Sequence, residues 1–121
     1  MIEKDFPVTK EDTALAVGSG GLAVLATPRV AAMVEAVCFE ALEARMQPGT
    51  TTVGTKLTID HRAASGIGAT VRVTCEETQK EKCYEFAFRI FENEELLATG
   101  THQRVVVDTA RFLKKVNGKK G

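Results

Sequence analysis

The stretch Thr27-Pro-Arg-Val-Ala-Ala-Met-Val-Glu-Ala-Val-Cys-Phe-Glu-Ala-Leu-Glu-Ala-Arg-Met46 is the only segment of the chain that is long and apolar enough for a central helix. Pro28 suits the first turn of a helix, and Thr27 before it can cap the free backbone N–H groups there. The turn formers Gln47-Pro-Gly49 follow the stretch. The sequence therefore predicts one long helix over residues 27–46.

Glu35 occupies an unusual place on this predicted helix. At about 100° per residue, Arg29, Glu40 and Glu43 form a narrow stripe that should face water, and Glu35 falls about 115° from its centre. The residues three and four positions from Glu35 include no lysine or arginine. Because an unpaired carboxylate on an apolar face costs several kcal/mol, we expect Glu35 to have a partner outside the helix.

Length and composition restrict the class of protein. A chain of 121 residues predicts one domain over residues 1–121. Sixteen Lys and Arg balance sixteen Asp and Glu, which argues against nucleic-acid binding. No run approaches the roughly 18 apolar residues of a membrane span, and the first residues lack the pattern of a secretory signal. Three cysteines, an odd number, favour a reducing cytoplasmic location over a disulfide framework or a zinc site.

The rest of the chain predicts strands. Residues 6–17 mix turn formers with β-branched residues and predict a first strand, and Gly18-Ser-Gly-Gly21 predicts a flexible segment that can serve as a lid or pocket wall. After Pro48-Gly49 the apolar residues alternate with polar ones, which is typical of strands. We expect four strands over residues 53–62, 69–76, 83–91 and 96–108, a charged hairpin connection at 79–82, and a short helix at 109–116.

One long helix followed by an antiparallel meander is an α+β plan. A sheet of about five strands and one largely apolar helix cover each other if the sheet wraps around the helix. This arrangement is the hotdog fold, in which two subunits usually pair their sheets edge to edge. We therefore expect a homodimer or a higher homo-oligomer.

Three side chains of this predicted fold suit chemistry on an acyl group, although Thr27 also reads as a helix cap and His61 as a strand-end residue. His61 shares its predicted strand face with Val53 and Leu57, and this face should cover the helix, so His61 can meet Glu35 within one subunit or across a dimer. A carboxylate and an imidazole at one pocket can activate water or attack a carbonyl, with Thr27 holding the carboxylate by a hydrogen bond. The helix N-terminus adds a positive dipole end for an oxyanion. The set suits hydrolysis of an activated acyl group.

At these residues the sequence resembles the hotdog acyl-CoA thioesterases, and within them the fluoroacetyl-CoA thioesterase-like group. The resemblance covers roughly Thr27 to Val116. It rests on Thr27 eight residues before Glu35, Glu35-Ala-Val-Cys38, Pro48-Gly49, Gly54-Thr55, Thr58-Ile-Asp-His-Arg-Ala-Ala64 and Gly100-Thr-His-Gln-Arg104. It implies an enzyme that hydrolyses acyl-CoA, with coenzyme A as part of the substrate and no separate cofactor.

The resemblance also implies roles for individual residues. Thr27, Glu35 and His61 would form the catalytic set, in which the carboxylate attacks the thioester or activates water and the histidine handles protons. Gly54 would lie near the thioester carbonyl, and Arg104 would line the pocket. From the residues alone, Gly54 also reads as a bulge or close-packing glycine and Arg104 as an ordinary strand arginine.

The segment before the helix departs from the fluoroacetyl-specific members, which carry a proline- and aromatic-rich lid there. Residues 16–25, Ala-Val-Gly-Ser-Gly-Gly-Leu-Ala-Val-Leu, contain no aromatic ring. Pro28-Arg29 also replaces the small and aromatic residues usual after Thr27, which removes one N–H donor from the helix start. The departure predicts a changed pocket that accepts a short or medium acyl chain.

Other functions fit parts of the pattern. A hotdog hydratase or dehydratase would use an acid and His61 on the carbon–carbon double bond of an enoyl-CoA. A non-catalytic module would bind acyl-CoA without turning it over. Cys38 with His61 is a possible nucleophile pair, whereas His61 and His102 are not spaced as metal ligands.

Overall fold

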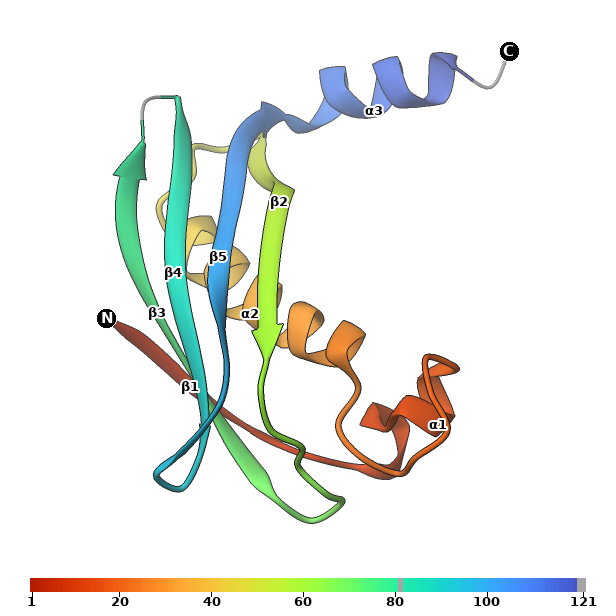
Figure 1. Cartoon of the computed structure of the whole chain (residues 1–121). Coiled ribbons are helices and arrows are strands. Elements are labelled where there is room, and N and C mark those ends of the chain that lie inside the picture. The colour runs from red at the N-terminus through yellow and green to blue at the C-terminus, as the bar shows by residue number, and fades with distance from the viewer. Residues whose placement is uncertain (81, 120–121) are drawn as a thin grey trace.

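The structure of the chain is a computed structural model that describes residues 1–80 and 82–119. One long helix lies across the concave face of a five-stranded antiparallel sheet (Figure 1). The elements in chain order are β1 (Ile2–Pro7), the short 3-10 helix η1 (Lys10–Asp12), α1 (Ala14–Val17), α2 (Thr27–Glu43), β2 (Thr50–His61), β3 (Thr70–Lys80), β4 (Cys83–Glu92), β5 (Glu95–Asp108) and α3 (Thr109–Gly118). This is the α+β architecture of the hotdog fold, as predicted.

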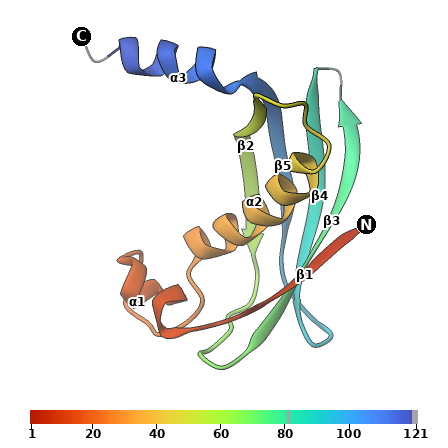
Figure 2. The ribbon, with the colours of Figure 1, turned by 180° about the vertical axis from the view of Figure 1, so that it is seen from behind.

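The strand order in the sheet is β1-β3-β4-β5-β2. Strands β3 to β5 form the expected meander, but β2 pairs with β5 instead of its sequence neighbour β3. The chain therefore crosses between the two sides of the sheet after β2, and β1 and β2 become the edge strands. Viewed from behind, α2 passes in front of the sheet from the α1 end toward the β3–β4 end (Figure 2).

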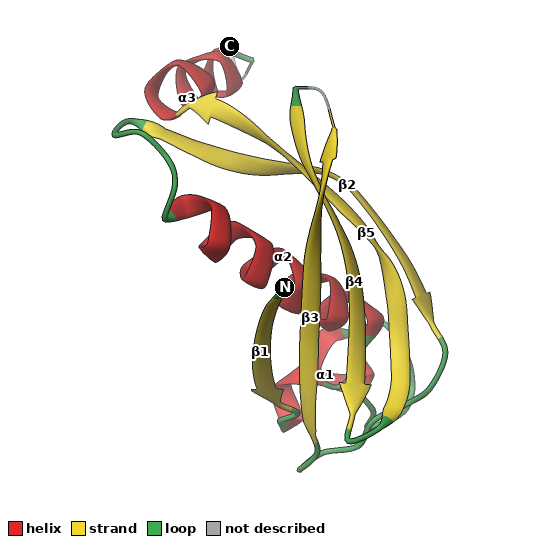
Figure 3. Ribbon diagram, turned by 90° about the vertical axis from the view of Figure 1, so that its left-hand side faces the viewer, coloured by secondary structure: helices red, strands yellow, loops and turns green. Residues whose placement is uncertain are grey.

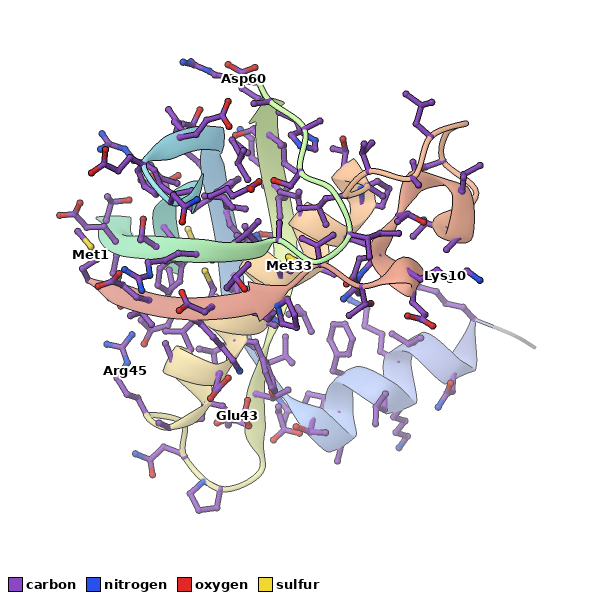
Figure 4. The ribbon with its side chains drawn as sticks, turned by 90° about the horizontal axis from the view of Figure 1, so that it is seen from below. Met1, Lys10, Met33, Glu43, Arg45 and Asp60 are labelled. Atoms are coloured by element: carbon purple, nitrogen blue, oxygen red, sulfur yellow. The ribbon has the colours of Figure 1, made fainter. Side chains whose placement is uncertain are left out.

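The core lies between α2 and the inner face of the sheet, which curves around the helix (Figure 3). The buried residues of α2 recur at helical spacing, and Met33 points into the interior (Figure 4). They are Val30, Met33, Val34, Val37, Cys38 and Leu42. The facing buried positions of β3 and β4 alternate along each strand, and they are Val71, Val73, Cys75, Phe86, Phe88 and Ile90. The apolar face of the helix and the apolar face of the strands, each recognisable by its periodicity in the sequence, thus pack together in one layer.

The N-terminal segment differs from the predicted strand over residues 6–17. Strand β1 ends at Pro7, and the residues after Thr9 form η1 and α1. Asp12 accepts hydrogen bonds from the backbone N–H and the hydroxyl of Thr9, and Thr13 Oγ1 accepts from the N–H of Ala16. These side-chain caps favour helical turns over strand.

The start of α2 also differs from the prediction. Ala26 is the N-cap, and Thr27 is already the first helical residue, so the expected capping role of Thr27 is wrong. Because Thr27 lies one position past the N-cap, its hydroxyl does not cap the helix and instead bonds to His61. The helix ends at Glu43, three residues before the predicted end.

A β-bulge in β2 changes which residues face the helix. Gly54 pairs with Arg104 and Lys56 with Gln103, so Thr55 is the extra residue. One extra residue reverses the alternation of side chains, so Val53 lies on the opposite face from Leu57 and its predicted place beside His61 is wrong. Gly54 takes the inward position. Its predicted character as a bulge or close-packing glycine is confirmed.

The remaining predicted elements lie close to their expected places. Strand β3 continues to Lys80 and β4 begins at Cys83, so the predicted hairpin connection shortens, and its residue 81 lies outside the described part of the chain. The expected C-terminal helix is α3, whose first turn is capped when Asp108 accepts from the N–H of Arg111. No helix in the described ranges is long and apolar enough to cross a membrane.

Gly100 of β5 provides a test of this packing. A Cβ at this position would overlap the carbonyl oxygen of Thr58 and lie 2.7 Å from the ring of Phe88. We expect Gly100→Ala to lower the free energy of unfolding by at least about 1–3 kcal/mol, the usual cost of overpacking a core. Urea denaturation measures the change.

Gly21→Ala is the matched control, because a Cβ at Gly21 would have no atom within 4 Å. Equal stabilities of the two variants would contradict the close contact at Gly100.

Candidate active site

Thr27 and His61 meet where α2 begins and β2 ends. Thr27 Oγ1 lies 2.8 Å from Nδ1 of His61, a hydrogen bond in which the donor depends on the tautomer of the ring. The sequence brought these two residues to one site correctly, although it assigned the threonine hydroxyl to the backbone and to Glu35. The pair can pass a proton between hydroxyl and imidazole.

The other ring nitrogen of His61 stands out. Nε2 is buried and has no hydrogen-bond partner within residues 1–80 and 82–119. Most buried polar atoms in native proteins do have a partner. The imidazole is therefore held at Nδ1 by Thr27, and its Nε2 is the ring atom left available for proton exchange.

A pocket of about 320 Å³ opens beside the pair. Its wall consists mainly of small or apolar side chains from the segment between α1 and α2 and from the turn after β2. The lining residues are Ala14, Ser19, Val24, Leu25, Ala26, Thr27, His61, Arg62, Ala63 and Ala64. The glycine-containing segment thus forms a pocket wall, one of its two expected roles.

This wall is attached to the start of α2. The N–H of Ala26 donates to the carbonyl of Asp12, and Nε of Arg29 donates to the Asp12 carboxylate at 2.8 Å. Burial alone would raise the pKa of Asp12, but the hydrogen bonds from Thr9 and Arg29 hold it below its usual range. Leu25 N–H donates to the carbonyl of Ser65, which fixes the far end of the wall to the turn before β3.

Glu35 lies two turns further along α2, against the bulge in β2. Its side chain is 47% exposed, and its Oε2 lies 3.8 Å from Nη1 of Arg104. A Cβ on Gly54 would lie 2.9 Å from the same oxygen. The expected partner outside the helix is therefore Arg104, and Gly54 has no side chain because the carboxylate occupies that space.

Arg104 is buried and held from two sides. Its Nε donates to Thr52 Oγ1 at 2.9 Å, and its Nη2 donates to the carbonyl of Thr52 at 3.0 Å. Its Nη1 lies 3.1 Å from Nε2 of His102, and the guanidinium stacks over the ring of Phe39 at 5.6 Å. Burial lowers the pKa of Arg104, and the negative charge of Glu35 opposes this effect. Arg104 is thus a fixed part of the site and not an ordinary strand arginine.

His102 completes this cluster. Its side chain is 1% exposed, and its Nδ1 lies 2.8 Å from the carbonyl of Lys56, directly after the bulge. Burial lowers the pKa of His102, and the nearby charge of Arg104 acts in the same direction against the hydrogen bond to Lys56. The imidazole is therefore neutral around pH 7.

One chain does not bring the three predicted catalytic residues together. Thr27 and Glu35 are eight residues apart, which is about 12 Å along a helix axis. Thr27 bonds to His61, whereas Glu35 faces Gly54 and Arg104. The structure separates the predicted site residues into two polar clusters on α2, one at its N-terminus and one at its middle, which are called the two half-sites of the candidate site.

Cys38 does not belong to either half-site. It is fully buried, its Sγ lies 3.7 Å from Sγ of Cys75, and the contact with Cys75 together with burial raises its pKa. A thiol with a raised pKa is a poor nucleophile. The Cys38–His61 pair is therefore wrong, and Cys38 and Cys75 are buried residues of the core.

Comparison with known proteins places the chain in a family. The profile of the fluoroacetyl-CoA-specific thioesterases matches residues 8–110, a range that contains Thr27, Glu35, His61 and Arg104. The chain belongs to this thioesterase family. It is an enzyme that acts on acyl-CoA thioesters, in agreement with the resemblance found in the sequence.

Individual relatives agree with this assignment. The fluoroacetyl-CoA thioesterase of Streptantibioticus cattleyicolor is 30% identical over 97 residues, which are 79% of this chain and 70% of the relative. A crystal structure of a variant fluoroacetyl-CoA-specific thioesterase with fluoroacetate and CoA is 25% identical, covers 100% of both chains and superposes with a TM-score of 0.92. A thioesterase superfamily member from Thermus thermophilus, 18% identical, shares the fold with a TM-score of 0.87 over 98% of this chain and 89% of its own.

The sequence analysis missed His102 and Thr52, which hydrogen-bond to Arg104 in the candidate site. It considered His102 only as a metal ligand, and the described residues hold no group of three or more metal-ligating side chains. A signal was present, because His102 and Arg104 are two residues apart on one strand and so share a face. Thr52 had no such signal, since the bulge at Thr55 shifts it onto the inner face.

The buried His102 predicts how stability depends on pH. The unfolded chain takes up a proton on this residue near pH 6.5, whereas the folded chain resists it because the pKa of His102 is lowered. The unfolded state then binds more protons, so the free energy of unfolding should fall as pH drops below about 6.5, by up to about 1.4 kcal/mol for each pH unit of this window. Urea denaturation between pH 7 and pH 5 measures the slope.

His102→Gln should remove this part of the slope. Asp12 does not interfere, because its lowered pKa costs stability only as pH falls below about 3.8. Identical slopes for the wild type and the variant would show that His102 is not the group that resists protonation.

Proposed function

We propose that this thioesterase hydrolyses the CoA thioester of a short or medium uncharged acyl chain with Thr27, Glu35 and His61 as its catalytic set. The observation that carries the proposal is the placement of His61 at the pocket. Its Nδ1 is bonded to Thr27, whereas its Nε2 is buried and has no hydrogen-bond partner in the described chain. Such a nitrogen would exchange a proton with a carboxylate or with the leaving group of a thioester.

The proposed active site is shared between two subunits. Since Thr27 and Glu35 lie about 12 Å apart along α2, a second chain has to supply the missing group to each half-site. Strand β2 is an edge strand with a free side. If two β2 strands pair antiparallel, Gly54 of one strand lies toward the His61 end of the other. Within each subunit Glu35 lies beside Gly54. The half-exposed carboxylate would then approach His61 of the other subunit.

The chemistry follows from these groups. Glu35 either removes a proton from water that attacks the thioester carbonyl, or attacks the carbonyl itself to form an anhydride that water then hydrolyses. In both routes a C–O bond forms and the C–S bond breaks. Nε2 of His61 donates a proton to the departing coenzyme A thiolate, and the proton lost by the attacking water replaces it on the ring. Hydrolysis of this kind needs no cofactor, and we expect the activity to survive EDTA.

Gly54 and Arg104 have supporting roles in this proposal. A missing side chain at Gly54 leaves the space beside Glu35 open to the thioester carbonyl. Arg104 compensates the charge of Glu35 from the side of the sheet, with a guanidinium that is itself held by Thr52.

The pocket wall suggests the acyl class. Its lining side chains are mostly alanine, valine and leucine, and they include no phenylalanine, tyrosine or tryptophan. Its one cation, Arg62, donates to the carboxylate of Asp60 at 2.8 Å. A small polar acyl group would find no aromatic shield or free charge here, whereas an apolar chain would find dispersion contacts. We therefore propose that fluoroacetyl-CoA is not the preferred substrate.

Thiol release from a panel of acyl-CoA thioesters tests the proposal. We expect kcat/KM to be highest for uncharged short or medium chains. Glu35→Gln and His61→Ala should each lose about 100-fold to 10,000-fold, the usual contribution of a general acid or base. Circular dichroism should show that both variants remain folded.

Full activity of Glu35→Gln would overturn the mechanism, and a preference for fluoroacetyl-CoA would overturn the acyl class. Enoyl-CoA hydration without thiol release would instead indicate a hydratase.

Mixing the two inactive variants tests the shared site. If Glu35 and His61 of one site come from different subunits, a dimer of one Glu35→Gln chain and one His61→Ala chain contains one intact site. Random reassociation of equal amounts should then restore roughly a quarter of the wild-type activity. A mixture as inactive as its components, once mass spectrometry has shown that mixed dimers form, would show that each site lies within one chain.

A further inference from the structure

The buried network around Arg104 contains a histidine that the proposed chemistry does not use. His102 lies on β5, two residues before Arg104 and opposite Leu57 of the edge strand. Both of its ring nitrogens have partners, one on each side of the ring. They are the carbonyl of Lys56 at 2.8 Å and Nη1 of Arg104 at 3.1 Å.

The partners determine the tautomer. A guanidinium has only donors, so Nε2 of His102 must accept from Arg104. A carbonyl has only acceptor sites, so Nδ1 must carry the proton that it donates to Lys56. The network is satisfied only by the neutral ring with its proton on Nδ1.

Three hydrogen bonds fix the orientation of the Arg104 guanidinium. Nε and Nη2 donate to Thr52, and one of the two Nη1 protons points to His102. Guanidinium and carboxylate groups that are free to move form short bidentate pairs. Here Nη1 stays 3.8 Å from Glu35, which is beyond hydrogen-bonding distance.

We propose that His102 is a positioning residue that holds Arg104 back from Glu35 through its Nε2 acceptor. The guanidinium then supplies charge to the site without capturing the lone pairs that Glu35 needs for attack or for proton removal. This role rests on the proposed function of Glu35. Without the acceptor, Nη1 turns to the carboxylate and the two close into a tight ion pair.

The β-bulge makes this arrangement possible. Lys56 follows the extra residue Thr55, and its carbonyl is the acceptor that fixes the ring of His102. The charged groups that face the ring are Arg104 from its own strand and Glu35 from α2, and the neighbouring residue on β4 is the apolar Phe86. A second proton on the ring would occupy the Nε2 acceptor of His102, and the positive ring would repel Arg104. Acidification should therefore release Arg104 toward Glu35.

Two substitutions separate the two sides of the ring. In His102→Gln the side-chain oxygen can reach the place of Nε2 and accept from Arg104, but the group cannot be protonated. In His102→Asn the shorter side chain can donate to Lys56 from the place of Nδ1 but leaves Arg104 without its acceptor. We expect His102→Asn to lose about 100-fold in kcat, as for a misplaced catalytic group, and His102→Gln to stay within about 10-fold of the wild type.

The pH profile adds a readout that a merely structural role would not move. The acid limb of kcat should lose one ionisation in His102→Gln. A His102→Asn enzyme that is as active as the wild type, or a His102→Gln enzyme that loses as much as His102→Asn, would overturn the proposal.

Imidazole ¹⁵N NMR of the wild-type protein tests the network without any activity. The expected spectrum shows the Nδ1–H tautomer of His102 and a slowly exchanging side-chain N–H of Arg104, and an Nε2–H tautomer would overturn the proposal even if His102→Asn failed to fold. If the wild type released no thiol while this spectrum was observed, the proposed function would fail and the role of His102 as the anchor of Arg104 would stand.

Discussion

The burial of the apolar face of α2 against the curved sheet is the interaction on which the rest of the structure depends. It fixes the depth of the helix, and thereby the distances of Thr27 and Glu35 from the strands behind them. The bulge in β2 then matters because it lies beneath the middle of α2, where the sheet presents a glycine and a buried arginine in place of apolar side chains. The Thr27–His61 and Glu35–Arg104 contacts lie at the two places where the helix meets the strands β2 and β5.

The buried positive charge of Arg104 is stabilised by surrounding neutral acceptors. Arg104 is almost fully buried, yet its donors meet the hydroxyl and carbonyl of Thr52 and the ring of His102 before they meet a carboxylate. A buried charge that depended on one ion pair would be costly to keep apart from its partner. Neutral acceptors stabilise the guanidinium, and the Glu35 carboxylate stays half-exposed.

Much of this fold could be predicted from the sequence because its two periodicities are strong. The helical spacing of Val30, Val34 and Val37 and the alternation in β3 and β4 led to the hotdog arrangement. The close packing at Gly54 also followed, whereas the sequence placed Thr27 and His61 in one set without predicting the hydrogen bond between them. The first strand was misplaced because local caps at Thr9 and Thr13 compete with β propensity. The face of Val53 was wrong because one inserted residue reverses a pattern of period two. His102 was overlooked because a buried neutral histidine depends on partners that only the tertiary structure brings together.

The hydrogen bonds that tie the pocket wall to the fold have a consequence for how acyl preference can diverge. Asp12 joins the wall to the first turn of α2, and Leu25 joins it to the turn before β3, so residues 14–24 form an insert between two fixed attachment points. The hydrogen bonds of this insert join mainly its own main-chain atoms, which tolerate changes of side chain. The segment can therefore vary in sequence like the variable loop of a binding protein, while Thr27 and His61 keep their distance.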